Sequence, residues 1–432
     1  MRATVVVSEY LVYIPAVINF LRRYTRIQGV PVWSASIALV AVLLQPATIL
    51  VDHGHFQYNT VMLGLVVASL DAILAGRILW ACIFFVGALG FKQMALYYAP
   101  VMFAFLLGVC TFPRIRLFRL LCISLVTTAA FAVLFAPLLI GASSVEARRD
   151  LGSTPQPPLL QALPFELDTS SVIYAPLFQL LQVVHRMFPF SRGLFEDKVA
   201  NAWCAIHTFY KLHRFDSSLL QRASLCATLA SILIPCVIIF RHPRASLLLP
   251  ALSTVSWGFF LFSFQVHEKS VLLPLLPMTL LLAGDGGLTK ETRSWVGWAN
   301  TLGSWTIFPL LKREKLQVPY FVMTFLWVYL LGLPPTSLET YRSRASSPDS
   351  AEPRLFTKLL HSCFYIAMTA WHIVDEFVPP PDGKPDLWVV LNALIGAGGF
   401  GIAYLWCLWK LITQCRRIDR KMAEEESQKK KQ

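Results

Sequence analysis

The sequence predicts an all-α membrane protein that crosses the bilayer many times. Of its 432 residues, 56% are hydrophobic and only 15% are charged, whereas a soluble domain carries about 25% charged residues. The hydrophobic residues form repeated runs of about 16 to 25 residues, the length at which an α-helix spans a bilayer. Lys and Arg fall in short clusters between these runs, as they do in polytopic membrane proteins.

The apolar runs predict a bundle of about 13 transmembrane helices in two modules. The expected spans are 4–20, 32–51, 60–75, 78–91, 94–110, 117–140, 223–240, 246–264, 270–284, 295–311, 319–334, 357–378 and 386–412. We divide the chain into an N-terminal transmembrane module (1–140), a long loop with amphipathic helices (141–222), a C-terminal transmembrane module (223–412) and a tail (413–432). Within the loop, residues 173–187 have the pattern of an amphipathic helix lying on the membrane or on the bundle.

The basic clusters predict the orientation, because cytosolic loops carry an excess of Lys and Arg. Four clusters are expected in the cytosol: 22–26, 114–119, 241–244 and 416–421. Counting crossings then puts the connections with unusual polar content on the other side: 52–59, 92–93, 141–222 and 265–270. One basic cluster, 312–315, also falls on that side and violates the rule.

Composition excludes several other classes of function. The net charge of +13 is explained by positive loops and by attraction to anionic lipid headgroups, and no nucleic-acid-binding module accompanies it. The nine cysteines are scattered without a CxxC pair, so the sequence indicates neither a disulfide framework nor a zinc site. Residues 1–20 lack a small-residue cleavage site and are interpreted as a spanning helix instead of a signal peptide. We expect no cofactor.

Residues 52–59 are the first candidate site. Asp52, His53, His55, Tyr58 and Asn59 stand here between two apolar runs. A connection that only reversed the chain would use Gly, Pro, Asn or Ser, and ionisable groups at a bilayer are costly and mark working sites. The alternative is a polar cap anchored at the membrane interface.

Two further polar motifs, 188–204 and 264–270, are expected on the same side of the membrane. A metal site built from Asp52, His53, His55, His267 and Glu268 is disfavoured, because the chain has no HExxH pattern. Anion binding fits better, since Arg and Lys bind phosphate strongly and fixed donors stabilise a leaving phosphate. The expected phosphate-binding residues are His53, His55, Lys92, Arg192, His267 and Lys269. The alternative for each residue alone is a snorkelling cation or a helix-capping histidine.

Three motifs carry a family resemblance. They are His-Gly-His-Phe-Gln-Tyr-Asn at 53–59, Phe-Ser-Arg-Gly-Leu-Phe-Glu-Asp-Lys-Val-Ala-Asn-Ala-Trp-Cys at 190–204 and Gln-Val-His-Glu-Lys-Ser at 265–270. Together they resemble the asparagine-linked-glycosylation glucosyltransferases of the endoplasmic reticulum, which are GT-C-fold enzymes that use dolichyl-phosphate-glucose. Gly54 and residues 196–201 are more similar to the enzyme that adds the first glucose than to its sister.

The resemblance implies a GT-C-like bundle with one long luminal loop and an inverting α-1,3-glucosyl transfer. Glucose would pass from dolichyl-phosphate-glucose to the terminal mannose of the dolichyl-diphosphate-linked Man9GlcNAc2 oligosaccharide. The protein would be a multi-pass protein of the endoplasmic-reticulum membrane with its C-terminus in the cytosol, bound to the lipid bilayer and to no nucleic acid. The polar residues expected to contact sugar are Asp52, Gln57, Tyr58, Asn59, Glu196, Asp197 and Glu268.

The chain departs from the family at its start. Family members begin with one further helix and a first luminal loop that carries the general-base aspartate, and this chain begins at what resembles their second helix. The catalytic base is therefore expected to be absent from these residues, with Asp52 the nearest local substitute. Two alternatives remain open: a catalytically inactive truncated isoform or paralogue that only binds donor lipid, and a polytopic lipid transporter.

Overall fold

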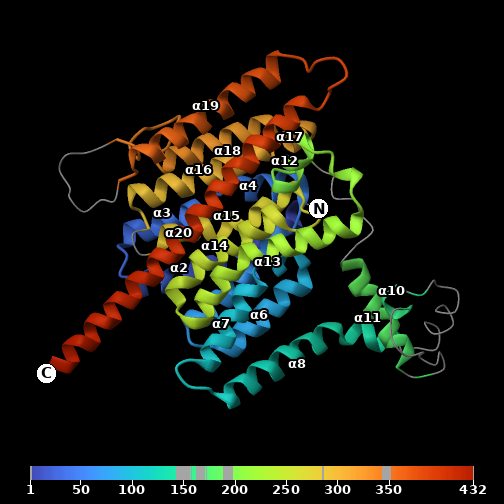
Figure 1. The fold of residues 1–432 in the computed structure, drawn as a ribbon, viewed down its shortest axis with the longest axis vertical. Coiled ribbons are helices and arrows are strands. Elements are labelled where there is room, and N and C mark those ends of the chain that lie inside the picture. The colour runs from blue at the N-terminus through green and yellow to red at the C-terminus, as the bar shows by residue number, and fades with distance from the viewer. Residues whose placement is uncertain are drawn as a thin grey trace.

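The computed structural model describes residues 2–142, 156, 158–161, 171, 173–187, 198–284, 287–342 and 352–431 (Figure 1). Within these residues every regular element is helical. The first half contains α1 (Arg2–Ser8), η1 (Glu9–Tyr13), α2 (Ile14–Gln28), α3 (Val32–Leu43), α4 (Pro46–Ile49), η2 (Leu50–Phe56), α5 (Asn59–Leu74), α6 (Ile78–Phe91), η3 (Gln93–Tyr97), α7 (Ala99–Thr111), α8 (Leu117–Ala142), α10 (Pro158–Gln161) and α11 (Tyr174–Met187). The second half contains α12 (Ala202–Phe209), η4 (Leu212–Arg214), α13 (Ser217–Arg241), α14 (Ala245–Phe262), η5 (Glu268–Val271), α15 (Leu272–Leu280), η6 (Leu281–Ala283), α16 (Lys290–Thr306), α17 (Phe308–Arg313), α18 (Gln317–Leu330), α19 (Leu355–Phe377) and α20 (Leu387–Lys431).

The predicted all-α polytopic architecture is confirmed. Six helical segments are long and apolar enough to cross a membrane: Ala3–Gln28, Val32–Phe56, Leu117–Ala142, Ser217–Arg241, Ala245–Phe262 and Leu387–Glu425. Four shorter apolar helices, α5, α6, α7 and α18, accompany them. The three other expected spans coincide with α15, α16 and α19. The count of about 13 crossings stays a prediction.

The helices differ in what they face. Every residue from Ser270 to Gly284 is buried, so the expected span 270–284 is enclosed by protein. Helix α14 packs on α13, α15 and α20 around this centre. In contrast, α8 buries only Ile123 and Ala142, and it lies at the edge of the bundle beside α11 (Figure 1). The apolar surface of α8 is therefore suited to contact with lipid.

One hydrophobic core joins the two expected transmembrane modules. Residues from 13–105 and from 232–415 belong to the same buried cluster. Hydrogen bonds connect the modules as well: the Trp327 indole donates to the Ala41 carbonyl at 2.9 Å, and the Tyr98 hydroxyl donates to the Leu273 carbonyl at 2.5 Å. Helix α20 continues unbroken through the expected boundary at 412. The division into domains stays a prediction.

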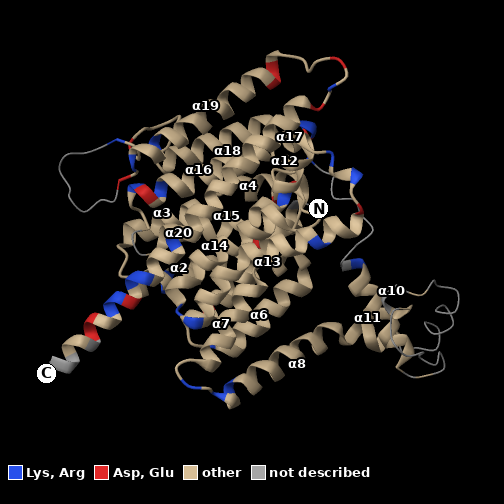
Figure 2. Ribbon diagram, viewed as in Figure 1, with Lys and Arg blue, Asp and Glu red and all other residues tan. Residues whose placement is uncertain are grey.

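Charged residues gather at the ends of the helices, whereas the middle of the bundle is nearly free of them (Figure 2). We call one end the basic end, because the connections 112–116 and 241–244 meet the tail helix there. The Phe112 and Phe240 rings lie 5.3 Å apart, and the Gln414 amide donates to the Ser246 carbonyl at 3.2 Å. Helix α14 runs from this end to Phe262, next to the expected motif 264–270. We call the end of the bundle at which 264–270 lies, opposite the basic end, the site end.

Gly64 allows α5 to approach the segment around Tyr13 closely. A Cβ atom at Gly64 would lie 2.8 Å from the Tyr13 Cα, which is backbone and cannot turn aside. We expect Gly64→Ala to lower the thermal unfolding temperature in detergent, because close helix contacts in membranes depend on small residues. Gly87→Ala in α6 is the matched control, since its Cβ would meet only a Leu65 methyl at 3.8 Å. Equal unfolding temperatures for the two variants would contradict this account.

Candidate active site at the site end

The first motif forms a π-helical turn that ends at the start of α5. Asp52 lies in this turn, η2, and its side chain is fully buried. One carboxylate oxygen accepts a hydrogen bond from the Thr60 backbone N–H at 2.6 Å, and the other accepts one from the Asn59 amide at 2.7 Å. An anion at a helix N-terminus is stabilised by the helix dipole and by unpaired N–H groups. Asp52 therefore holds the turn and the helix in one arrangement.

Lys92 is positioned over this turn. It follows the last residue of α6, and its ammonium donates to the Gln57 side-chain oxygen at 3.2 Å and to the Asn59 side-chain oxygen. Burial lowers the pKa of Lys92 from its ordinary value; the Asp52 charge opposes this shift and the Lys269 charge adds to it. The two lysines thus repel each other across the same part of the site, where an anion would relieve the repulsion.

Lys269 reaches the first motif from the third one. Its ammonium lies 2.8 Å from the His55 Nε2 atom, and the other ring nitrogen of His55 contacts the Glu314 carboxylate. The neighbouring Glu268 lies 3.5 Å from the Arg313 guanidinium. Two of the three expected motifs therefore meet, although His55 and Lys269 are 214 residues apart in the sequence.

Residues of the basic cluster 312–315 contact this site. Arg313 pairs with Glu268, and Lys312 pairs with Asp375 at 2.8 Å. Glu314 in the same cluster carries a negative charge and contacts His55. The crossing count placed 312–315 with the polar motifs, and these contacts agree with that placement.

A second π-helical turn faces the first. Glu9 lies in η1, and its carboxylate is 2.5 Å from the Nε2 atom of His53 in η2. Nearby, the Thr4 and Tyr58 hydroxyls are 2.5 Å apart. π-Helical turns are rare and occur frequently at functional sites.

Backbone conformation also marks this region. Among the described residues, only three that are not glycine have positive φ angles: Phe56 at 74°, Gln265 at 57° and Lys315 at 59°. Each lies in one of the three connections that meet at the site end. The left-handed conformation costs about 1–2 kcal/mol for a residue with a side chain, and such strain clusters at active sites and ligand clamps.

The second motif is described from residue 198 onward. Asn201 caps α12 by accepting a hydrogen bond from the Cys204 N–H at 2.8 Å, and the Trp203 indole donates to the Phe262 carbonyl at 2.7 Å. These contacts attach the end of the motif to the end of α14. Arg192, Glu196 and Asp197 lie outside the described residues.

The side chain of His267 is exposed at the site end, next to Glu268 in the chain. The structure thus brings together nine of the expected site residues: Asp52, His53, His55, Gln57, Tyr58, Asn59, Lys92, Glu268 and Lys269.

Three charged site residues were missed by the sequence analysis: Glu9, Arg313 and Glu314. Glu9 stood inside an expected apolar span, and an ionisable residue in such a position is itself a signal of function. Arg313 and Glu314 belonged to the cluster that violated the positive-inside rule, so the violation was the signal there.

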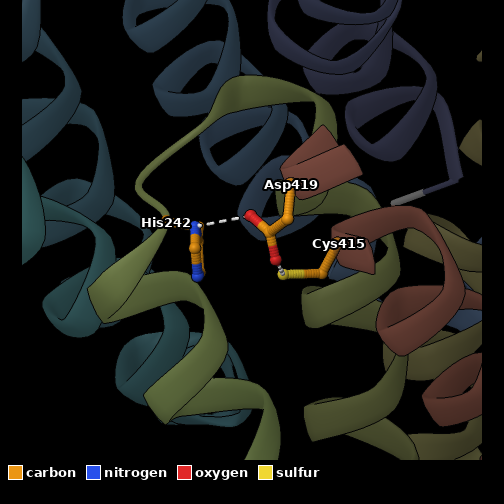
Figure 3. Close-up of side chains that lie close together, drawn as sticks. All are labelled: His242, Cys415 and Asp419. Carbon is orange, nitrogen blue, oxygen red and sulfur yellow. Dashed lines mark hydrogen bonds and ion pairs between the residues drawn. The ribbon is translucent and has the colours of Figure 1, made fainter. Parts of the chain in front are cut away.

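A separate cluster lies at the basic end. His242 from the α13–α14 turn points toward Asp419 of α20 at 3.5 Å, and the Cys415 thiol lies 3.9 Å from the same carboxylate (Figure 3). One nitrogen, one sulfur and one oxygen atom lie within 4.8 Å of one another. Their mutual contacts attach the tail helix to the bundle, at the end opposite the polar motifs.

Comparison with known proteins identifies the family of the chain. The chain matches the ALG6, ALG8 glycosyltransferase family over residues 1–149 and 163–409. It is 39% identical, over 95% of its length and 71% of the relative, to a Schizosaccharomyces pombe protein named probable dolichyl pyrophosphate Man9GlcNAc2 alpha-1,3-glucosyltransferase. A Saccharomyces cerevisiae protein of that name, without "probable", is 39% identical over 96% of this chain and 72% of the relative. The chicken protein of that name is 30% identical over 94% of this chain and 76% of the relative. The chain therefore belongs to the ALG6, ALG8 glycosyltransferase family.

Proposed function

We propose that this protein transfers glucose, in α-1,3 linkage and with inversion, from dolichyl-phosphate-glucose to the terminal mannose of lipid-linked Man9GlcNAc2. The names of its relatives support the acceptor and the linkage. The proposal that the donor is a lipid phosphate is supported by one observation: Lys92, His55 and Lys269 lie together at one end of an apolar helix bundle. A phosphate attached to a lipid would reach such a site from the membrane.

The cations at the site end suit a departing phosphate. Lys92 and Lys269 are held from different connections, and His55 is fixed between Lys269 and Glu314. When the glycosidic bond to dolichyl phosphate breaks, negative charge grows on the phosphate oxygens. Donors that are already in place stabilise this charge without reorganising, which lowers the barrier. Arg192 and His267 stay proposed phosphate-binding residues from the sequence.

Sugar binding is proposed for the polar side chains that surround these cations. Glu268, Gln57 and Tyr58 are partly exposed and offer acceptors and donors for hydroxyl groups. Asp52 is fully buried and both of its oxygens accept hydrogen bonds from the chain. We therefore assign Asp52 a positioning role, together with Asn59. Glu196 and Asp197 stay proposed sugar ligands from the sequence.

Inversion requires a carboxylate that removes the proton from the attacking hydroxyl. We assign this role to no described residue. Glu9 is engaged with His53, and Glu314 is engaged with His55. These two carboxylates are proposed to orient the imidazole rings: Glu314 holds the His55 ring from one side, while the Nε2 atom of that ring accepts a hydrogen bond from the Lys269 ammonium.

The proposed orientation follows from the charges of the two ends. The basic end, with the clusters 114–119, 241–244 and 416–421, would face the cytosol. The site end would then face the lumen of the endoplasmic reticulum, where the acceptor glycan is displayed. Attaching an N-glycosylation acceptor sequence after the C-terminus tests this, since the tag stays unmodified if that terminus is cytosolic.

A reconstitution assay tests the proposed function. The purified full chain is incubated in lipid vesicles with dolichyl-phosphate-glucose and lipid-linked Man9GlcNAc2. The glycans are then cleaved from the lipid, and their masses are measured by mass spectrometry. We expect one added hexose, which α-1,3-specific glucosidase removes, and none on an acceptor that lacks the terminal mannose. Binding of the donor without any transfer would instead support the inactive, donor-binding alternative.

The pH profile of transfer reports on Lys92. Because burial penalises its ammonium form, the pKa of Lys92 is lower than that of an ordinary lysine. The charged form exists below that pKa, so the rate is expected to fall as pH rises through it, before ordinary lysines titrate near about 10.4. Lys92→Arg is expected to move this alkaline limb to higher pH, and Lys384→Arg, at an exposed position in another connection, to leave it in place. An unmoved limb in Lys92→Arg would exclude Lys92 as its source.

A further inference from the structure

A cavity of about 360 Å³ opens between α2, α5 and α6, apart from the site just described. Helix α5 begins at Asn59 in that site, and its first residue in the cavity lining is Ala68, about 14 Å further along the helix. The residues that line the cavity come from 16–23 in α2, the last turns of α5, the α5–α6 connection and the first turns of α6. The cavity therefore lies near the basic end of the bundle.

The polar wall of the cavity carries two guanidinium groups. Arg23 donates through its Nε–H to the Asp71 carboxylate at 2.7 Å, which fixes the side chain and leaves its terminal NH₂ groups without a hydrogen bond among the described residues. Arg77 forms no ion pair in the described part of the chain. Two arginines and one aspartate give the wall a net charge of +1. Asn19 lies one helical turn before Arg23 on the same face of α2.

Small apolar side chains make up much of the remaining lining, which leaves room for an acyl chain. They are Ala16, Ala68, Ala72 and Ala75, on the same segments of the chain as the polar residues. Trp80 and Phe84 stand beside the opening with ring centroids 6.0 Å apart, and Trp80 is 54% exposed. Trp is enriched at the membrane–water interface, where its ring sits at the level of the lipid headgroups.

Polar side chains that face lipid cost free energy unless each of them finds a hydrogen-bond partner. The Asn19 amide lies within the apolar segment Ala3–Gln28 and makes no hydrogen bond among the described residues. Ionisable and amide groups at this depth pair with one another, with water or with a ligand. Basic pockets between transmembrane helices on the cytosolic side bind lipid headgroups.

We propose that this cavity binds the headgroup phosphate of an anionic glycerophospholipid from the leaflet at the basic end. The terminal NH₂ groups of Arg23 and the guanidinium of Arg77 donate to the phosphate oxygens, as Arg does in planar phosphate sites. Asn19 donates to an ester oxygen deeper in the membrane. An acyl chain lies along the alanines and beside the Trp80 ring. This site is independent of the proposed glucosyl transfer.

Native mass spectrometry of the purified full chain in detergent tests the proposal. Phosphatidylinositol is expected to remain bound to the wild-type protein and to raise its thermal unfolding temperature, whereas phosphatidylcholine and soluble glycerol 3-phosphate do neither. Arg77→Gln is expected to weaken phosphatidylinositol binding about fivefold, the factor typical of one basic residue at an anionic membrane surface. Arg22→Gln, at an exposed residue on the same helix end that does not line the cavity, is expected to bind as the wild type does.

Three results would overturn the proposal. They are equal retention of phosphatidylcholine, an equal shift with glycerol 3-phosphate, and equal phosphatidylinositol binding by wild type and Arg77→Gln. Comparing unfolding temperatures without added lipid separates a binding defect from misfolding, because Arg77 makes no ion pair among the described residues and its replacement is expected to leave the fold intact.

Discussion

Replacing Lys269 with alanine is expected to lower kcat/KM for glucosyl transfer about 100-fold to 1,000-fold, the usual loss when one fixed donor to a developing anion is removed. The ammonium of Lys269 lies 2.8 Å from the His55 ring, and it acts on Lys92 across the site. Its loss removes one proposed phosphate ligand and frees His55 on one side. Rates are measured with reconstituted protein at saturating and limiting dolichyl-phosphate-glucose, so that kcat and KM are obtained separately.

Two variants make this result specific. Lys269→Arg keeps a cation in place and is expected to recover part of the lost rate. Lys384→Ala removes an exposed cation from the connection between α19 and α20 and is expected to retain wild-type activity. Wild-type activity in Lys269→Ala would refute the proposed phosphate site while leaving the family assignment untouched.

Replacing Asp52 with alanine is expected to destabilise the protein by about 3 kcal/mol, because it strands buried hydrogen-bond donors. The Thr60 N–H would lose its only described side-chain partner, and the Asn59 amide would keep only the Gln57 oxygen at 3.0 Å. The first turn of α5 would also lose the anion at its N-terminus. Thermal and denaturant unfolding in detergent measure the loss, and transfer activity is expected to fall with it because Lys92 contacts Asn59.

Asp52→Asn separates the two contributions. It retains one acceptor and the shape of the side chain, so it is expected to be more stable than Asp52→Ala and less stable than wild type. Asp382→Ala, at an exposed acid in another connection, is expected to change stability by less than about 0.5 kcal/mol. An Asp52→Ala protein as stable as the wild type would contradict the capping role.

The positions of the helices were predictable because each apolar run is long and bounded by polar or basic residues. The run at 60–75 became α5, and the run at 223–240 became the apolar part of α13. Depth in the bundle was not predictable from hydropathy. Residues 270–284 are as apolar as a lipid-facing span, yet all of them are buried inside the protein, since lipid and protein interior select similar side chains.

The gathering of the motifs at one end was also predictable, because counting crossings needs only the number of spans between loops. The individual contacts were not. His55 and Glu314 are 259 residues apart, and nothing local in either segment specifies the other. The pairing of Glu9 with His53 depends on two π-helical turns. Hydrophobic periodicity does not reveal them, because η1 lies between the ordinary helices α1 and α2 and η2 follows α4 directly.

The paired π-helical turns have an evolutionary consequence. Each such turn holds one residue more than an α-helical turn, so a one-residue deletion in η1, which lies between α1 and α2, would restore α-helical geometry and leave α2 in register with its neighbours. The side chains of the turn itself would be re-aimed, which would swing Glu9 away from His53. Single-codon insertions and deletions at such a turn therefore offer a short route by which related sequences can re-aim side chains of the site while preserving the membrane-embedded scaffold.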